Sequence, residues 1–188
     1  MLMTPLRYCH HLLSQLISTG DTVIDATVGN GKDTIKLAQL VGKTGKVYGF
    51  DIQTAAIEET KKKAQLTGLT EQIELIADGH ENFKKYLPHN IQVQALVFNL
   101  GYLPRGDKSI ITLPATTLSA LEQGLDLLNV GGQILMMIYY GHEGGPEEKD
   151  AVLSYIKTLP QENFSVLQYG FINQKNTPPF LIAIEKRK

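Results

Sequence analysis

The connection between the last two predicted strands, residues 173–179, is the feature that most constrains the fold. These strands are expected near 165–172 and 180–185, and seven residues are too few for a helical crossover between parallel neighbours. The two strands must therefore pair antiparallel. The rest of the chain alternates strand-like and helix-like segments, which predicts α/β architecture with a mostly parallel sheet. A C-terminal antiparallel hairpin is thus expected to end an otherwise parallel sheet.

Apolar periodicity and glycine positions predict the remaining elements. Strands are expected at 22–26, 46–50, 73–77, 94–99 and 133–140, and helices at 5–18, 32–41, 54–67, 115–128 and 146–158. Together with the hairpin, this makes a seven-stranded sheet in a single domain over residues 1–188, without repeats or linkers. A reversed last strand is typical of the class I methyltransferase fold, which is Rossmann-like. A dinucleotide-binding domain would instead keep its strands parallel.

Composition and charge limit the classes of protein to which the chain can belong. Hydrophobic residues make up 43% and charged residues 20% of the sequence, as in a soluble globular domain. No apolar run suits a membrane span and no signal peptide is recognisable, so no membrane partner is expected. The single cysteine, Cys9, favours the cytoplasm, and no His or Cys grouping has metal-site spacing. The net charge of -1 means that any RNA contact must depend on local basic patches.

A glycine-containing turn follows the first predicted strand, where open α/β sheets bind ligands. Gly29 and Gly31 allow a close approach, and amides of the next helix can bind the carboxylate of a methionine moiety. Asp25 and Asp33 are candidates for its ammonium group. A nicotinamide fingerprint would need a third glycine where Thr34 stands. The segment therefore favours S-adenosylmethionine, with cofactor contacts expected from Asp25, Thr27, Gly29, Asn30, Gly31, Asp33 and Thr34.

Acidic residues end the second and third predicted strands. Asp51 suits the two hydroxyls of an adenosine ribose, and Ile52 and Gln53 can flank the adenine. Asp78, followed by Gly79 and His80, can accept a hydrogen bond from the adenine amino group, although an Asp at such a place is often a helix cap. These residues, together with Asn99 at the end of the fourth predicted strand, complete the predicted cofactor site.

The fourth predicted strand ends in the reacting centre. Asn99 followed three residues later by an aromatic residue has the form that nitrogen methyltransferases use. The side-chain oxygen of Asn99 and the carbonyl of Leu100 or Gly101 can accept the hydrogens of an amine and so aim its lone pair at the methyl carbon. Tyr102 can stack on a base. We therefore predict Asn99, Gly101 and Tyr102 as catalytic; a buried Asn beside a core Tyr is the structural alternative.

Further residues are expected around the substrate because they follow the fourth and fifth strands or lie in the hairpin at the same sheet edge. Arg105 and Lys108 can hold phosphates, and Asp107 can take a proton or an amine hydrogen. The full set of predicted substrate contacts is Tyr102, Pro104, Arg105, Asp107, Lys108, Tyr140, His142, Lys175 and Asn176.

Three signatures carry a resemblance to the YtqB-like methyltransferases, a bacterial family labelled rRNA methylases. They are residues 25–34 (DATVGNGKDT), residues 99–104 (NLGYLP) with Asp107 and Lys108, and residues 140–145 (YGHEGG). The resemblance covers nearly the whole chain. It implies S-adenosylmethionine, a homodimer and a tRNA substrate bound through its anticodon region: the amino group of 5-aminomethyl-2-thiouridine at the wobble position. Leu100-Gly101 replaces the double proline of the usual nitrogen-methyltransferase motif, which suits a flexible alkyl amine.

The prediction is therefore an S-adenosylmethionine-dependent N-methyltransferase that acts on the tRNA wobble uridine. An enzyme for rRNA or for a small amine is the alternative within the same class. A nicotinamide-dependent oxidoreductase is a second alternative, against which the missing third glycine and the closing hairpin count. A non-catalytic RNA-binding module is the third.

Overall fold

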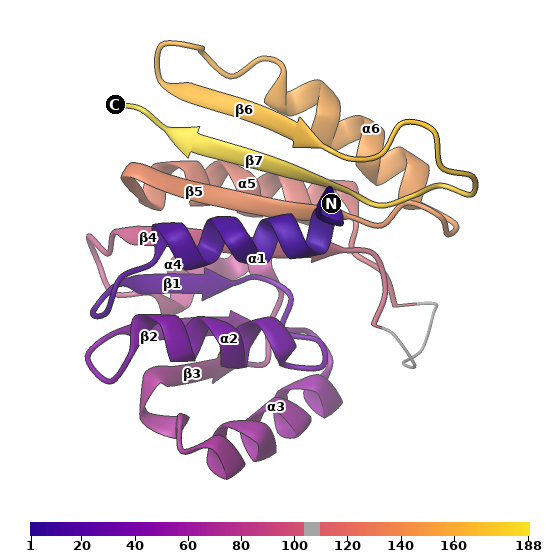
Figure 1. Cartoon of the computed structure of the whole chain (residues 1–188). Coiled ribbons are helices and arrows are strands. Elements are labelled where there is room, and N and C mark those ends of the chain that lie inside the picture. The colour runs from indigo at the N-terminus through magenta and orange to yellow at the C-terminus, as the bar shows by residue number, and fades with distance from the viewer. Residues whose placement is uncertain (104–109) are drawn as a thin grey trace.

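All strands of the computed structural model, which describes residues 1–103 and 110–188, belong to one seven-stranded sheet (Figure 1). The strand order is β3-β2-β1-β4-β5-β7-β6. The strands are β1 (Thr22–Asp25), β2 (Lys46–Phe50), β3 (Ile73–Ile76), β4 (Val93–Leu100), β5 (Leu128–Ile138), β6 (Phe164–Tyr169) and β7 (Phe180–Lys186). The α-helices are α1 (Pro5–Leu16), α2 (Lys32–Val41), α3 (Thr54–Thr67), α4 (Phe83–Tyr86), α5 (Pro114–Leu127) and α6 (Gly145–Ile156). Two 3₁₀ turns, η1 (Thr70–Gln72) and η2 (His80–Asn82), precede β3 and α4.

The pairing directions confirm the predicted fold. Strands β3, β2, β1, β4 and β5 pair in parallel, whereas β7 pairs antiparallel with both β5 and β6. The C-terminal hairpin is therefore present, and β7 is inserted between β5 and the edge strand β6. Because β1 lies between β2 and β4, the strand order reverses beside β1, which is where open α/β sheets form their ligand crevice.

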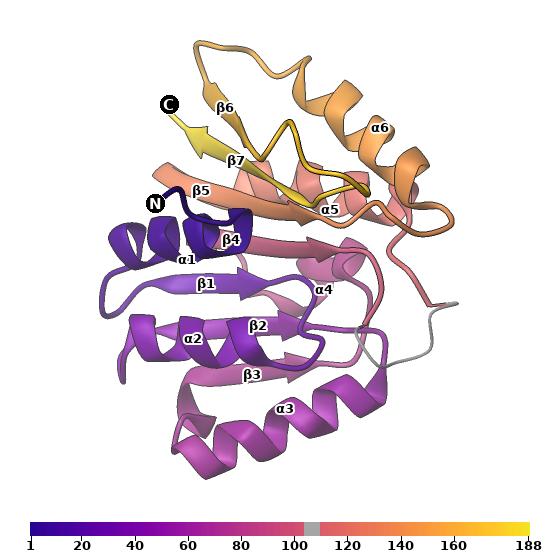
Figure 2. The same ribbon diagram turned by 45° about the vertical axis from the view of Figure 1, so that its right-hand side comes forward.

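Alternating strand residues build two cores, one on each face of the sheet. On one face, Leu13 of α1 and Leu37 of α2 pack with Val23, Val97 and other strand residues. On the other face, helices α4, α5 and α6 pack on a cluster that includes Ile24, Leu96 and Phe98. Figures 1 and 2 show α1 and α2 in front of the sheet and α5 behind it. The central strands read as nearly continuous apolar runs because both of their faces are covered.

Two of the differences from the predicted elements have a clear physical cause. A turn was expected at 129–132, but β5 begins at Leu128, and the register with β4 shifts between Val93 and Ala95. Gly131 has a φ of 80°, a conformation that glycine adopts readily, so this segment forms an irregularity within the strand. Short α4 was not predicted because a four-residue helix has no measurable apolar period.

No helix within the described parts of the chain combines the length and apolarity that a membrane crossing requires.

Candidate active site

A cavity of about 920 Å³ lies at the carboxyl edge of the parallel strands. Its walls come from the segments that follow β1, β2, β3, β4 and β5, together with α1 and the start of α2. The separate strand ends singled out in the sequence thus meet around one cavity. Of the predicted cofactor residues, those that line it are Thr27, Gly29, Asn30, Asp33, Asp51, Ile52, Gln53, Asp78, Gly79, His80 and Asn99.

The turn between β1 and α2 needs glycine at two positions. Gly29 and Gly31 have φ values of 52° and 70°, and a side chain on Gly31 would collide with Thr60. Gly31 is also the residue directly before α2, and no side chain forms a capping hydrogen bond with the amides of the first helical turn. These amides, with the positive end of the helix dipole, form a site for an anion such as a carboxylate.

Asp25 has a different place from the one that we predicted. Its side chain is fully buried and does not line the cavity, and neither do Gly31 and Thr34. Its carboxylate accepts hydrogen bonds from the Thr34 hydroxyl (2.6 Å) and the Thr27 amide (3.2 Å), so it ties the turn to α2. Burial, reinforced by the Asp33 charge, raises the pKa of Asp25 to about 7. Because Asp25 ends β1 between two paired strands, its side chain lies inside the fold.

Asp51 lies at the cavity wall with both carboxylate oxygens fixed. One oxygen accepts from the Gly29 amide and the other from the Gln53 amide, each at 2.8 Å. Each oxygen keeps a second lone pair, so the pair of ribose hydroxyls can still be bound. Ile52 beside it is 60% exposed, and an apolar side chain left open at a cavity suits the face of an adenine ring. The residues at this end of the cavity therefore fit an adenosine.

Asp78 and His80 line the cavity after β3. The Asp78 carboxylate accepts from the side chains of Tyr86 (2.7 Å) and Asn82 (3.0 Å), and it does not cap η2, whose N-cap residue is Gly79. The Tyr86 hydrogen bond is the main cause that lowers the pKa of Asp78. His80 Nδ1 lies 3.1 Å from the Ala26 carbonyl oxygen and must carry the hydrogen, and its buried Nε2 has no partner in the part of the chain that the structure describes. Burial lowers the pKa of His80, so its ring is held neutral.

Asn99 is oriented by a hydrogen-bond chain that crosses from β4 to α1. Its amide nitrogen donates to Asp33 (2.8 Å), whose second oxygen lies 2.8 Å from His10 Nε2. A carboxylate only accepts, so the Asn99 nitrogen must face Asp33 and its Oδ1 is left to accept from a ligand. Burial alone would raise the pKa of Asp33, but the hydrogen bonds from His10 and Asn99 hold it below its usual value.

The two carbonyl groups that follow Asn99 already have partners. The Leu100 oxygen accepts from the Tyr139 amide (3.0 Å), and the Gly101 oxygen from the Thr112 amide (2.9 Å). Of the acceptors predicted for the amine, the Asn99 Oδ1 is therefore the one without a protein partner among the described residues.

Aromatic side chains form the wall beside Asn99. Tyr102 and His142 meet edge to face, with ring centroids 5.4 Å apart, and Tyr139 and Tyr140 also line the cavity. His142 Nδ1 lies 2.8 Å from the Glu143 carbonyl oxygen, so Nδ1 carries the hydrogen, and the buried Nε2 is an acceptor without a partner among residues 1–103 and 110–188. Burial and the nearby Asp33 charge raise the pKa of Tyr139.

The buried Glu148 of α6 stabilises the segment that follows β4 through a network of hydrogen bonds. It accepts from the hydroxyls of Thr112 and Thr117, each at 2.6 Å, and the Thr112 hydroxyl in turn accepts from the Gly101 amide (2.9 Å). The network joins the end of β4 to α5 and α6.

The remaining predicted substrate residues divide into three groups. Tyr102, Tyr140 and His142 line the cavity. Lys175 and Asn176 are exposed and do not line it, although the adjacent Thr177 does. Pro104, Arg105, Asp107 and Lys108 lie outside the described residues.

Sequence reasoning missed several lining residues, among them His10, Lys32, Thr112 and Tyr139. Only Tyr139 had a usable signal, since it directly precedes the predicted Tyr140 at the end of a strand. Within 1–103 and 110–188, no group of His, Cys, Asp and Glu is arranged to hold a metal ion.

Comparisons with known proteins identify the family of the chain. Residues 47–185 match a family model described as "Putative rRNA methylase". The chain is 40% identical to the chloroplastic tRNA (mnm(5)s(2)U34)-methyltransferase of Arabidopsis thaliana, over 95% of this chain and 68% of the relative. A solved rRNA-methylase structure from Clostridium thermocellum is 48% identical with a TM-score of 0.96, covering 99% of both chains. A Streptococcus mutans methyltransferase solved in complex with SAH is 44% identical with a TM-score of 0.91, again covering 99% of both chains.

These relatives confirm the predicted enzyme class and its S-adenosylmethionine cofactor. The alternatives of a nicotinamide-dependent oxidoreductase and of a non-catalytic RNA-binding module are therefore set aside. The family model spans well over half of the sequence. The chain accordingly belongs to the rRNA methylase family of S-adenosylmethionine-dependent methyltransferases.

Proposed function

We propose that this enzyme methylates an alkyl amine on RNA, namely the amino group of 5-aminomethyl-2-thiouridine at the wobble position of tRNA. The observation that carries the proposal is the fixed Asn99 amide, whose nitrogen is held by Asp33 and whose oxygen is left for an amine. The aromatic wall of Tyr102, Tyr139 and His142 suits a stacked base. The plant relative named for mnm5s2U34 of tRNA supports this choice of nucleotide.

The residues of the cavity divide between the two ligands. The first-turn amides of α2 would hold the methionine carboxylate, and Asp51 with Ile52 would hold the adenosine. Asp33 and Asn99 line the same cavity as these residues and the aromatic wall. S-adenosylmethionine supplies a methyl group on a sulfonium, which is already activated for transfer. The chain therefore needs to orient the amine and to exclude water, and it has no need for a nucleophile of its own.

The amine must reach the methyl carbon with its lone pair free. An alkyl amine of pKa about 10 is protonated in neutral water, so it has to lose a proton before it attacks. The Nε2 of His142, a residue of the cavity wall, has no hydrogen-bond partner among the described residues and would take that proton. Asn99 Oδ1 then accepts one of the two remaining hydrogens and fixes the lone pair. As the nitrogen–carbon bond forms, the sulfur–carbon bond breaks and its electron pair stays on sulfur.

A competition among acceptors tests the substrate. The purified enzyme receives methyl-labelled S-adenosylmethionine together with tRNA from cells lacking this protein, rRNA from the same cells, or a free alkyl amine. We expect label in tRNA alone. The family description makes rRNA the second candidate. Label in rRNA or in the free amine, with none in tRNA, would contradict the wobble substrate and leave the enzyme class standing.

The assembly and the compartment are part of the same proposal: a homodimer in a reducing compartment such as the cytoplasm. Edge strand β6 exposes Val166 (41%) and Leu167 (46%), which supports an apolar contact between copies. The free, buried Cys9 supports a reducing compartment. Light scattering after gel filtration should give twice the chain mass of 20.8 kDa. A particle of single-chain mass at micromolar concentration would contradict the dimer.

A further inference from the structure

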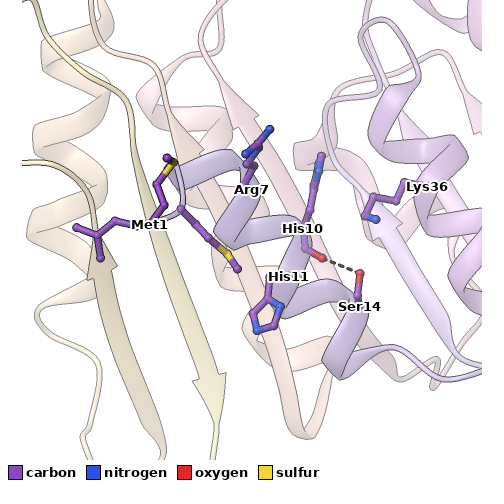
Figure 3. Close-up of a pocket in the computed structure, with 8 residues that line it drawn as sticks. Met1, Arg7, His10, His11, Ser14 and Lys36 are labelled. Carbon is purple, nitrogen blue, oxygen red and sulfur yellow. Dashed lines mark hydrogen bonds between the residues drawn. The ribbon is translucent and has the colours of Figure 1, made fainter.

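We propose that a basic hollow on α1 binds backbone phosphates of the RNA substrate next to the methylated nucleotide. This α1 hollow has a polar side, formed by Arg7, His10, His11 and Ser14 of α1 with Lys36 of α2, and an apolar side formed by residues 1–3, and its volume is about 530 Å³ (Figure 3). The inference rests on the proposed function, because it assigns a surface to the RNA that the enzyme would modify.

The two cationic side chains of the α1 hollow have no ion-pair partner at contact distance among the described residues. Arg7 and Lys36 form no ion pair with any described residue, and no acidic side chain lines the hollow. Residues 1–20 contain no Asp or Glu at all. Asp33, next to the hollow, forms hydrogen bonds with His10 and Asn99, and the charge of Lys36 helps to lower its pKa.

Several cations elsewhere are neutralised by contrast. Lys63 pairs with Glu59 at 2.6 Å, and Lys84 pairs with Asp126 at 3.4 Å. Lys149 pairs with Asp150 at 3.0 Å. Because the whole chain has a net charge of -1, a polyanion has to be attracted by such a local surplus of positive charge.

The α1 hollow adjoins the reaction cavity. His10 lines both spaces. On α2, Lys32 lines the cavity and Lys36 lines the hollow, and their spacing of one turn places them on the same helix face. On α1, Arg7, His11 and Ser14 are spaced by about one turn each and share a face in the same way. Hydrogen-bond donors on α1 and α2 thus extend from the cavity to the α1 hollow.

This arrangement fits a nucleic-acid backbone. A nucleotide whose base enters the cavity remains joined to phosphates on either side, and these must lie over the rim of the cavity. Arg and Lys are the side chains that most often contact phosphate, and such contacts position an RNA without reading its sequence. The α1 hollow therefore determines affinity for the RNA, while the aromatic wall and Asn99 act on the base and its amine.

A charge-matched pair of double variants tests the assignment. Arg7→Ala with Lys36→Ala removes two charges from the hollow, and Lys62→Ala with Lys157→Ala removes two exposed charges elsewhere. Affinity for tRNA is measured by fluorescence anisotropy over a range of salt concentrations, and SAH binding by calorimetry reports on folding and the cofactor site. Methyl transfer to tRNA and to the free nucleoside 5-aminomethyl-2-thiouridine is measured for both variants and for the wild type.

We expect the hollow variant to bind tRNA about tenfold more weakly, with a log K against log salt slope shallower by about 1.4, because each phosphate contact to single-stranded RNA contributes about 0.7. Its SAH affinity and its turnover of the free nucleoside should stay within twofold of the wild type. The control variant should bind tRNA like the wild type. Equal tRNA affinity and salt slope in the hollow variant and the wild type, or equal losses in both variants, would overturn the inference. An inactive wild type on tRNA would instead refute the proposed function.

Discussion

At the scale of single residues, the site depends on polar side chains whose partners leave each with one defined role. Asn99 faces Asp33 with its nitrogen and therefore offers its oxygen. His142 donates through Nδ1 to the Glu143 carbonyl and therefore offers the Nε2 lone pair. Asp25 acts at a distance from the ligands, because it holds the Thr34 hydroxyl and the turn that precedes it. Each role follows from what a neighbouring group can donate or accept.

Replacement of Asn99 by Ala removes the group that orients the amine. We expect kcat for methyl transfer to fall by about 10²- to 10³-fold, the usual cost of losing one preorganised polar contact to the reacting group. SAH affinity should remain within about threefold of the wild type, because Asp51 and the α2 amides are untouched. Single-turnover kinetics with calorimetry measures both quantities. Unchanged turnover would remove Asn99 from the mechanism.

The buried Asp25 predicts a particular pH dependence of stability. Its pKa is raised to about 7, so the folded chain holds a proton that the unfolded chain releases near pH 4. Between these values the folded state binds more protons, and the Asp25 contribution to the unfolding free energy declines as pH rises.

Asp25→Asn removes that titration while keeping the size of the side chain. Compared with the wild type, the variant should gain stability from pH 5 to pH 7, by up to about 1.4 kcal/mol for each pH unit. Urea unfolding at the two pH values measures the difference. A difference that stays constant with pH would show that Asp25 does not titrate in this range.

At the scale of elements, much of the architecture could be predicted because it depends on local pattern. The short connection at 173–179 determined the reversed last strand, and the acidic or amide residues at the ends of β2, β3 and β4 indicated one common edge. The contacts of His10 with Asp33 and of Asn99 with Asp33 could not be predicted, since these partners lie 23 and 66 residues apart. Spacing also could not distinguish Asp25, which is buried, from Asp33, which lines the cavity.

Glu148 joins three elements, and its replacement tests how firmly the loop after β4 is held. Glu148→Gln keeps one acceptor oxygen and loses the other, so one of the two threonine hydroxyls loses its partner. We expect a loss of about 1–3 kcal/mol in the free energy of unfolding, the usual cost of an unsatisfied buried polar group. Its exposed neighbour provides the control, and Glu147→Gln should change stability by less than about 0.5 kcal/mol. Equal effects of both variants in urea unfolding would argue against the network.

At the scale of the whole molecule, one sheet edge collects the cofactor end, the reacting amide, the aromatic wall and the adjoining α1 hollow. Helices cover both faces of the sheet, and the cavity lies at the carboxyl ends of its parallel strands. The chain has a net charge of only -1, but Arg7 and Lys36 place positive charge in the α1 hollow beside the cavity.

The most direct test of the central claim is nucleoside mass spectrometry of tRNA from cells that lack this protein, before and after the wild-type gene is restored. The account predicts that 5-aminomethyl-2-thiouridine accumulates in the deficient cells and that restoration converts it to the methylaminomethyl nucleoside. Identical wobble nucleosides in both samples would contradict methylation of the tRNA wobble amine.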